Sequence, residues 1–167
     1  MTRALIVFVA AFVPMLMEAR RSWRNEAALR QSGAVEAAGD VYAAMQVAYP
    51  GCFLLMIGES WMWDRGLGRS FAAGVAVFVA AKLLKYWAIG TLGPRWSFRV
   101  LVTPGAPLVA SGPYRWLRHP NYVGIAGELA GAALMAYAPV TGVISLVLFG
   151  ALMLARIGVE ERALGLS

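Results

Sequence analysis

The sequence is poor in cysteine. Its one cysteine, Cys52, lies inside an apolar run, which excludes an intrachain disulfide and leaves no spacing typical of a metal site. A single thiol in such a place usually packs as a small apolar side chain. We therefore predict neither a disulfide framework nor a bound metal.

Charge is scarce as well. Charged residues make up 14% of the 167 residues and hydrophobic residues 60%, which is too apolar for an ordinary soluble domain. The net charge of +6 is mostly arginine, gathered between apolar runs: Arg20, Arg21, Arg24 and Arg30 in one gap, and Arg95, Arg99, Arg115 and Arg118 in another. Loop arginines that set membrane topology explain this pattern better than nucleic-acid binding does.

Five apolar runs predict an all-α integral membrane protein with about five transmembrane helices: 4–17, 41–63, 71–90, 122–137 and 143–158. Although the first run is short, no small-residue cleavage site follows it, so we predict a retained helix rather than a signal peptide. Residues 19–40 are polar and predict either an interfacial amphipathic helix or a solvated linker. Three helices and this loop would form a unit over 1–90, leaving a cofactor-binding loop, a hairpin and a catalytic segment for 91–167.

The third run contains two lysines, Lys82 and Lys85, which share one helix face. A charge inside a bilayer is tolerated where it is paired, faces a cavity or reaches the headgroups. We expect both lysines to extend towards the cytosolic end of the helix.

The last two runs predict an antiparallel hairpin, because only residues 138–142 separate them. Two helices of similar length return the chain to the membrane face that it left. One polar cluster should therefore form there from Arg118, His119, Tyr122, Arg156, Glu160 and Glu161, with Glu128 about two turns along the fourth helix.

Such a cluster suits a ligand that carries both signs of charge and an apolar part, as S-adenosylmethionine does. Carboxylates can accept from its ribose hydroxyls or ammonium, and cationic or backbone donors can hold its carboxylate. The alternative is an ion-paired helix end of arginines and glutamates that only stabilises the hairpin.

Two motifs carry a family resemblance: Arg118-His-Pro-Asn-Tyr-Val-Gly124 and, on the last helix, Arg156-x-x-x-Glu160-Glu161. Together they resemble the isoprenylcysteine carboxyl methyltransferase family and its relatives among the membrane phospholipid methyltransferases. The resemblance covers roughly residues 85–165 and is best over 108–124.

The resemblance implies an S-adenosylmethionine site. It implies that Ala106, Pro107, Leu108 and Val109 border the cofactor, that Tyr114 packs near it, that His119, Pro120, Asn121 and Tyr122 wrap it, and that Glu160 contacts it. It also implies that Arg156 faces the acceptor. The sequence departs from the family at Ala106, where relatives often carry a histidine or another polar residue.

Methyl transfer is an in-line displacement at a carbon already activated by the sulfonium, so the protein mainly positions the partners and excludes water. A carboxylate acceptor would need only Arg156 to hold it, whereas a hydroxyl or phenol would need a base such as His119 or Glu161. The bilayer favours a lipid-tailed acceptor that enters sideways between helices. A prenylated protein and a small isoprenoid acid, quinol or alkyl-phenol both remain open.

Two other classes compete. Membrane sterol-type reductases, which use NADPH, carry a similar Arg-His-Pro-Asn-Tyr-x-Gly block followed directly by an acid, whereas Gly124 is followed here by three residues before Glu128. This difference favours the methyltransferase. A non-enzymatic membrane subunit that docks a partner through the charged cluster is the third possibility.

Arginine distribution predicts the orientation. With the 19–40 loop, the 91–121 loop and the carboxyl terminus in the cytosol, nine arginines lie there, and Arg3, Arg65 and Arg69 lie outside. The Ala-, Gly- and Arg-rich composition is typical of a bacterial protein, so we predict a bacterial inner membrane location with the site facing the cytosol.

Overall fold

Five α-helices account for most of the residues that the structure describes. The computed structural model describes residues 1–63 and 66–166. Its elements are α1 (Thr2–Gln31), β1 (Val35–Glu36), α2 (Tyr42–Trp63), α3 (Arg69–Leu92), η1 (Gly93–Arg95), β2 (Leu101–Val102), η2 (Gly112–Arg115), α4 (Pro120–Ala136) and α5 (Pro139–Ala163), where η marks a 3-10 helix. The two short strands pair antiparallel, Val35 with Val102.

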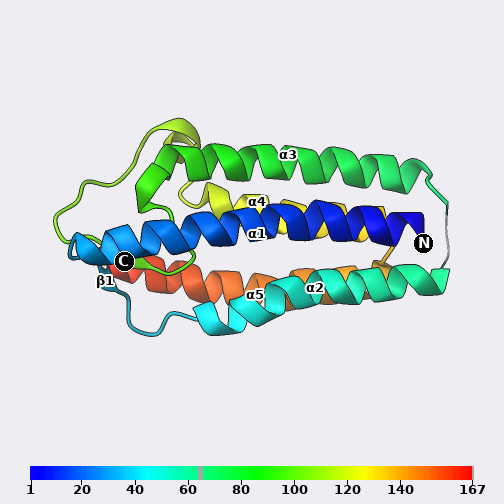
Figure 1. The fold of residues 1–167 in the computed structure, drawn as a ribbon, viewed down its shortest axis with the longest axis horizontal. Coiled ribbons are helices and arrows are strands. Elements are labelled where there is room, and N and C mark those ends of the chain that lie inside the picture. The colour runs from blue at the N-terminus through cyan, green and yellow to red at the C-terminus, as the bar shows by residue number, and fades with distance from the viewer. Residues whose placement is uncertain (64–65, 167) are drawn as a thin grey trace.

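The helices lie side by side in one elongated bundle (Figure 1). The described residues contain three helical stretches long and apolar enough to cross a membrane, Thr2–Gln31, Arg69–Arg95 and Pro139–Ala163. The predicted all-α membrane fold is confirmed. Each helix runs opposite to the one before it, so the 32–41 loop, the 93–119 loop and the carboxyl end of α5 share one end of the bundle.

The amino-terminal helix differs from the prediction. It does not stop near Met17 but continues to Gln31, so the expected separate polar segment over 19–40 is wrong. The extension is stabilised by tertiary contacts: the Nδ2 of Asn25 donates to the carbonyl of Trp96 at 2.7 Å, and the Oγ of Ser22 accepts from the backbone N–H of Phe98 at 2.7 Å. Hydropathy could not reveal these partners, which lie about seventy residues away.

Helices α3 and α4 touch through glycines. A Cβ placed on Gly131 would lie 2.6 Å from the backbone nitrogen of Phe78, and one on Gly74 would lie 2.5 Å from that of Met135. Gly127 is equally close to Ala81, at 2.7 Å from its Cβ. Only glycine permits this approach, and small residues allow close backbone packing where no hydrophobic effect drives helices together.

Four charged side chains form a buried square inside the bundle, which we call the charge square: Glu18 of α1, Lys82 and Lys85 of α3, and Glu128 of α4. Each lysine bridges both glutamates, with Nζ to oxygen distances of 3.0 and 3.1 Å for Lys82 and of 2.6 and 3.3 Å for Lys85. The hydroxyl of Tyr49 donates to Glu128 as well. The square is electrically neutral, which is how a membrane interior tolerates four charges.

The charge square corrects two predictions. The lysines do not extend to the headgroups, because both are buried against carboxylates that the sequence did not connect to them. Glu128 belongs to this square and not to the polar cluster at the helix ends.

The carboxyl-terminal hairpin is confirmed (Figure 1). Tyr137 adopts a left-handed conformation with φ 55°, which ends α4, and α5 begins two residues later. A carboxylate from another helix caps α5, since Glu59 of α2 accepts from the backbone N–H groups of Val140 and Thr141 at 3.1 and 2.7 Å. This interaction satisfies donors that a helix start leaves free.

Candidate functional site

The hairpin brings His119 to the end of α5. His119 is the residue before α4, and its ring nitrogens face two consecutive carboxylates. Nε2 lies 3.1 Å from Glu161 Oε1, and Nδ1 lies 3.6 Å from Glu160 Oε2. Arg118, which is largely exposed, pairs with the same Glu161 oxygen at 3.4 Å. The predicted meeting of the two motifs thus occurs in the structure.

Two tyrosines complete this group. The hydroxyl of Tyr122 interacts with both Glu160 and Arg156. Burial raises the pKa of Tyr114, and the negative charge of Glu160 raises it further, which places Tyr114 within electrostatic reach of that carboxylate. The structure therefore gathers Tyr114, His119, Tyr122, Arg156, Glu160 and Glu161.

Carboxylates control the charge of His119. Glu160 first and then Glu161 raise the pKa of the imidazole above its ordinary 6.5, whereas partial burial acts in the opposite direction. A raised pKa keeps His119 protonated at higher pH than in an unfolded chain.

This shift predicts a pH dependence of stability. Because the folded-state pKa of His119 is the higher one, its contribution is fully present below about pH 6.5 and is lost as pH rises through the raised value. We expect the midpoint of thermal unfolding to fall between about pH 6 and pH 9 by more in the wild type than in His119→Gln. Parallel slopes for the two proteins would contradict the assignment.

Arg156 is bound by residues of two distant loops. Its Nη1 lies 3.2 Å from Asp40 Oδ1, and its Nη2 donates to the carbonyl of Phe98. The side chains of Arg156 and Asp40 are only 7% and 5% exposed. The guanidinium is therefore already neutralised inside the protein.

Two buried oxygens of this region accept no hydrogen bond from the part of the protein that the structure describes, although one of them lies 3.6 Å from His119 Nδ1. Among the described residues, Oδ1 of Asn121 and Oε2 of Glu160 are buried and accept no hydrogen bond. Buried acceptors are normally satisfied, and an unsatisfied one costs about 1–3 kcal/mol. Both residues are among those expected to contact the cofactor, and both can accept from ribose hydroxyls or an ammonium group.

The segment expected to border the cofactor lies in the long loop before η2. Ala106, Pro107 and Leu108 are exposed, and Val109 is half-buried. Arg95 of η1 donates to the carbonyl of Pro107 at 2.7 Å, which ties this loop to the turn that follows α3. The Gly112-Pro113 turn lies close against the end of α3, because a Cβ on Gly112 would lie 2.4 Å from the Oγ1 of Thr91.

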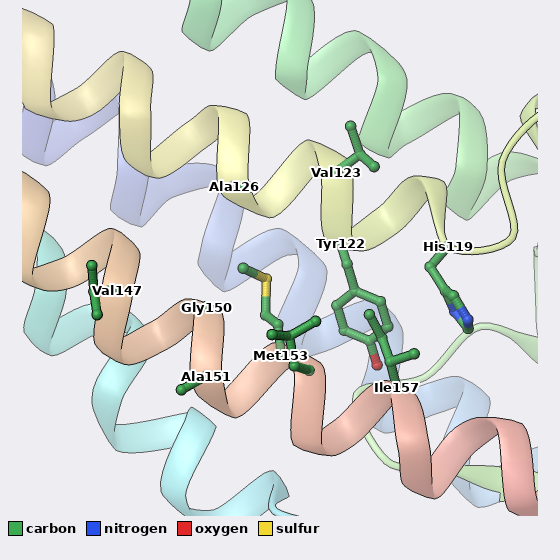
Figure 2. A pocket seen from close by; sticks show the side chains of 10 residues that line it. His119, Tyr122, Val123, Ala126, Val147, Gly150, Ala151, Met153 and Ile157 are labelled. Atoms are coloured by element: carbon green, nitrogen blue, oxygen red, sulfur yellow. The ribbon is translucent and has the colours of Figure 1, made fainter.

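An apolar groove of about 490 Å³ leads along the bundle to this polar group. Figure 2 shows it between α4 and α5, with the rings of Tyr122 and His119 at one end. Its other lining residues are Val123, Ala126, Val147, Gly150, Ala151, Met153, Leu154 and Ile157. The groove thus has apolar walls and a cluster of titratable groups at one end.

The comparison with protein families decides the relationship. The model of the isoprenylcysteine carboxyl methyltransferase family matches residues 74–165, more than half of the chain. The chain belongs to this family. The matched region contains the charge-bearing ends of both hairpin helices, so the resemblance seen in the two motifs is confirmed.

Two bacterial proteins are similar to this family member over most of its length. The uncharacterized protein YpbQ of Bacillus subtilis is 30% identical over 141 residues, which cover 84% of each chain. An uncharacterized protein of Haemophilus influenzae is 25% identical over 144 residues, covering 86% of this chain and 84% of the relative. No solved structure matches the chain.

Sequence reasoning missed Asp40 and the groove-lining residues of α5. Asp40 stands in a loop among small residues, and nothing in its neighbourhood marks it as the partner of Arg156, which lies 116 positions further on. The groove follows from the way two apolar helices pack, whereas hydropathy shows only that both are apolar.

Proposed function

We propose that this membrane methyltransferase uses S-adenosylmethionine and methylates an oxygen of a lipophilic acceptor. The observation that carries the proposal is the junction of the apolar groove with His119 and Tyr122, next to buried oxygens of Asn121 and Glu160 that accept no hydrogen bond from the described residues. A lipid tail suits the groove, and a cofactor with hydroxyl and ammonium donors suits the two oxygens.

Each residue then has a role. Glu160 and Asn121 would accept from the cofactor, with Tyr114, Pro120 and the 106–109 segment around it. When bound, S-adenosylmethionine supplies a methyl group on a sulfonium. The chain holds the acceptor oxygen in line and keeps water out, which is the main contribution a protein can make to such a displacement.

The charges favour an acceptor that arrives as a hydroxyl or phenol. Arg156 is already paired with Asp40, and Arg118 with Glu161, so a carboxylate acceptor would compete with internal carboxylates. A hydroxyl acceptor would instead give its proton to His119 in the neutral form of the imidazole, with Glu161 stabilising the resulting imidazolium, as its oxygen takes the methyl group and the cofactor leaves as a thioether. The 3.1 Å contact between His119 and Glu161 allows the proton to be shared.

Arginine positions support a cytosolic site in a bacterial inner membrane. Arg20, Arg24, Arg95, Arg118 and Arg162 lie towards the site end of the bundle, whereas Arg3 and Arg69 lie at the other. Arg65 is outside the described residues. Water-soluble S-adenosylmethionine would then reach the site from the compartment that makes it.

Calorimetric titration of the detergent-purified protein with S-adenosylhomocysteine, and in parallel with NADPH, tests the proposal. We expect saturable binding of S-adenosylhomocysteine and none of NADPH. Binding of NADPH alone would establish the reductase alternative. Binding of neither ligand, in detergent and again after reconstitution into lipid nanodiscs, would refute the enzyme assignment in favour of a non-enzymatic membrane subunit.

A further inference from the structure

The loop between α1 and α2, residues 32–41, is bound to residues 96–102, which precede the 103–118 loop of the candidate cofactor site. We call residues 32–41 together with 96–102 the clasp. Its strands pair Glu36 with Leu101, and the N–H of Ala37 donates to the carbonyl of Val100 at 2.9 Å. Arg99 adds an ion pair to Glu36 at 2.6 Å.

The extended end of α1 fixes the same segment from another side. Ser22 accepts from the N–H of Phe98, and Asn25 donates to the carbonyls of Gly93 and Trp96 at 3.2 and 2.7 Å. The amino-terminal quarter of the chain, outside the matched family region, thus determines where the 103–118 loop begins.

Asp40 joins the clasp to α5. Its Oδ2 accepts from the N–H of Val100 at 3.1 Å, and its Oδ1 accepts from the N–H of Tyr42 at 3.1 Å and faces Arg156 Nη1 at 3.2 Å. Arg156 completes the connection by donating to the carbonyl of Phe98. One buried carboxylate and one buried guanidinium therefore connect three segments, one helical turn before Glu160.

We infer that Asp40 is a positioning residue for the cofactor site. Acting through Arg156, it fixes the start of the 103–118 loop relative to Glu160 on α5, so that both sides of the site keep one geometry. The predicted effect of Asp40 on cofactor affinity rests on the proposed function. Its predicted effect on the order of the 103–118 loop does not. Asp40 itself need not touch either ligand.

A double-mutant cycle tests this inference with Asp40→Asn, Arg156→Gln and their combination. The first measurement is backbone hydrogen–deuterium exchange over residues 103–118, which Asp40 does not touch, and the second is the Kd for S-adenosylhomocysteine. We expect Asp40→Asn to speed exchange in that loop and to weaken binding about 10-fold, but to add less than about twofold when Arg156 is already glutamine.

The matched control is Glu36→Gln. Glu36 is an acid of the same loop that pairs with Arg99 of the clasp and with Arg30 of α1, and neither arginine lies in α5. We expect its effects to be the same whether residue 156 is arginine or glutamine.

An effect of Asp40→Asn that is equal in both backgrounds, or no effect on loop exchange, would overturn the inference. If the single variant does not fold but the combined variant does, the coupling is established; if neither folds, the role is only structural and the inference fails. If the wild type binds no S-adenosylhomocysteine, the proposed function fails, and the exchange cycle alone decides about Asp40.

Discussion

Glu160→Gln is expected to weaken S-adenosylhomocysteine binding on the order of 100-fold, which corresponds to about 2.8 kcal/mol. Glu160 has a buried oxygen without a hydrogen-bond donor and lies beside His119 and Tyr122. A hydrogen bond to a charged group contributes about 1.5–3 kcal/mol, and the amide would replace an acceptor by a donor. Calorimetry on the two purified proteins measures the change.

The adjacent residue supplies the control. Glu161 contacts His119 and Arg118 and is proposed to share the acceptor proton, not to hold the cofactor. Glu161→Gln should therefore leave the Kd within about threefold of the wild type and lower turnover of a hydroxyl acceptor. Equal loss of binding in both variants would show that the pair acts only through the fold, and retained binding in Glu160→Gln would remove Glu160 from the cofactor site.

Lys85→Met is expected to destabilise the protein by about 3–5 kcal/mol. It removes one corner of the charge square and leaves Glu18 and Glu128 with a single lysine between them. Breaking a buried ion pair by deleting one partner is costly because the remaining charge stays buried without compensation. Reversible unfolding in mixed micelles measures the free energy.

Restoring neutrality should recover part of this loss. In Lys85→Met/Glu18→Gln the 3.1 Å pair of Lys82 with Glu128 remains, so the double variant should be more stable than the single one. Leu83→Ala, on the same helix but 66% exposed, should change stability by less than about 1 kcal/mol. A double variant less stable than Lys85→Met would show that the square acts through packing rather than charge.

Local patterns in the sequence predicted the parts of the fold that depend on near neighbours. Apolar runs gave the helices, and a short link between the last two gave the hairpin, which in turn brought His119 near Glu160 and Glu161. These inferences need only helix rise and loop length.

Contacts between distant segments were not predictable in the same way. The extension of α1 depends on Asn25 and Ser22 meeting the 93–98 segment, and the burial of Lys82 and Lys85 depends on Glu18 and Glu128 facing them. The pairing of Arg156 with Asp40 likewise joins residues that are far apart in the sequence. In each case the position of a polar residue, at the surface or buried, depends on its partner. A single sequence does not identify that partner.

The glycine contact between α3 and α4 also bears on how a bulky ligand could enter. With Phe78 against Gly131 and Met135 against Gly74, these two helices have no space to slide past one another, and they should move as one rigid body. Helix α5 contacts α2 through Glu59 and the 32–41 loop through Asp40, and it contacts the start of α4 through His119. The groove lies between α4 and α5, so a ligand that widens it must displace α5 from the α3–α4 pair and weaken the contacts of His119 with Glu160 and Glu161.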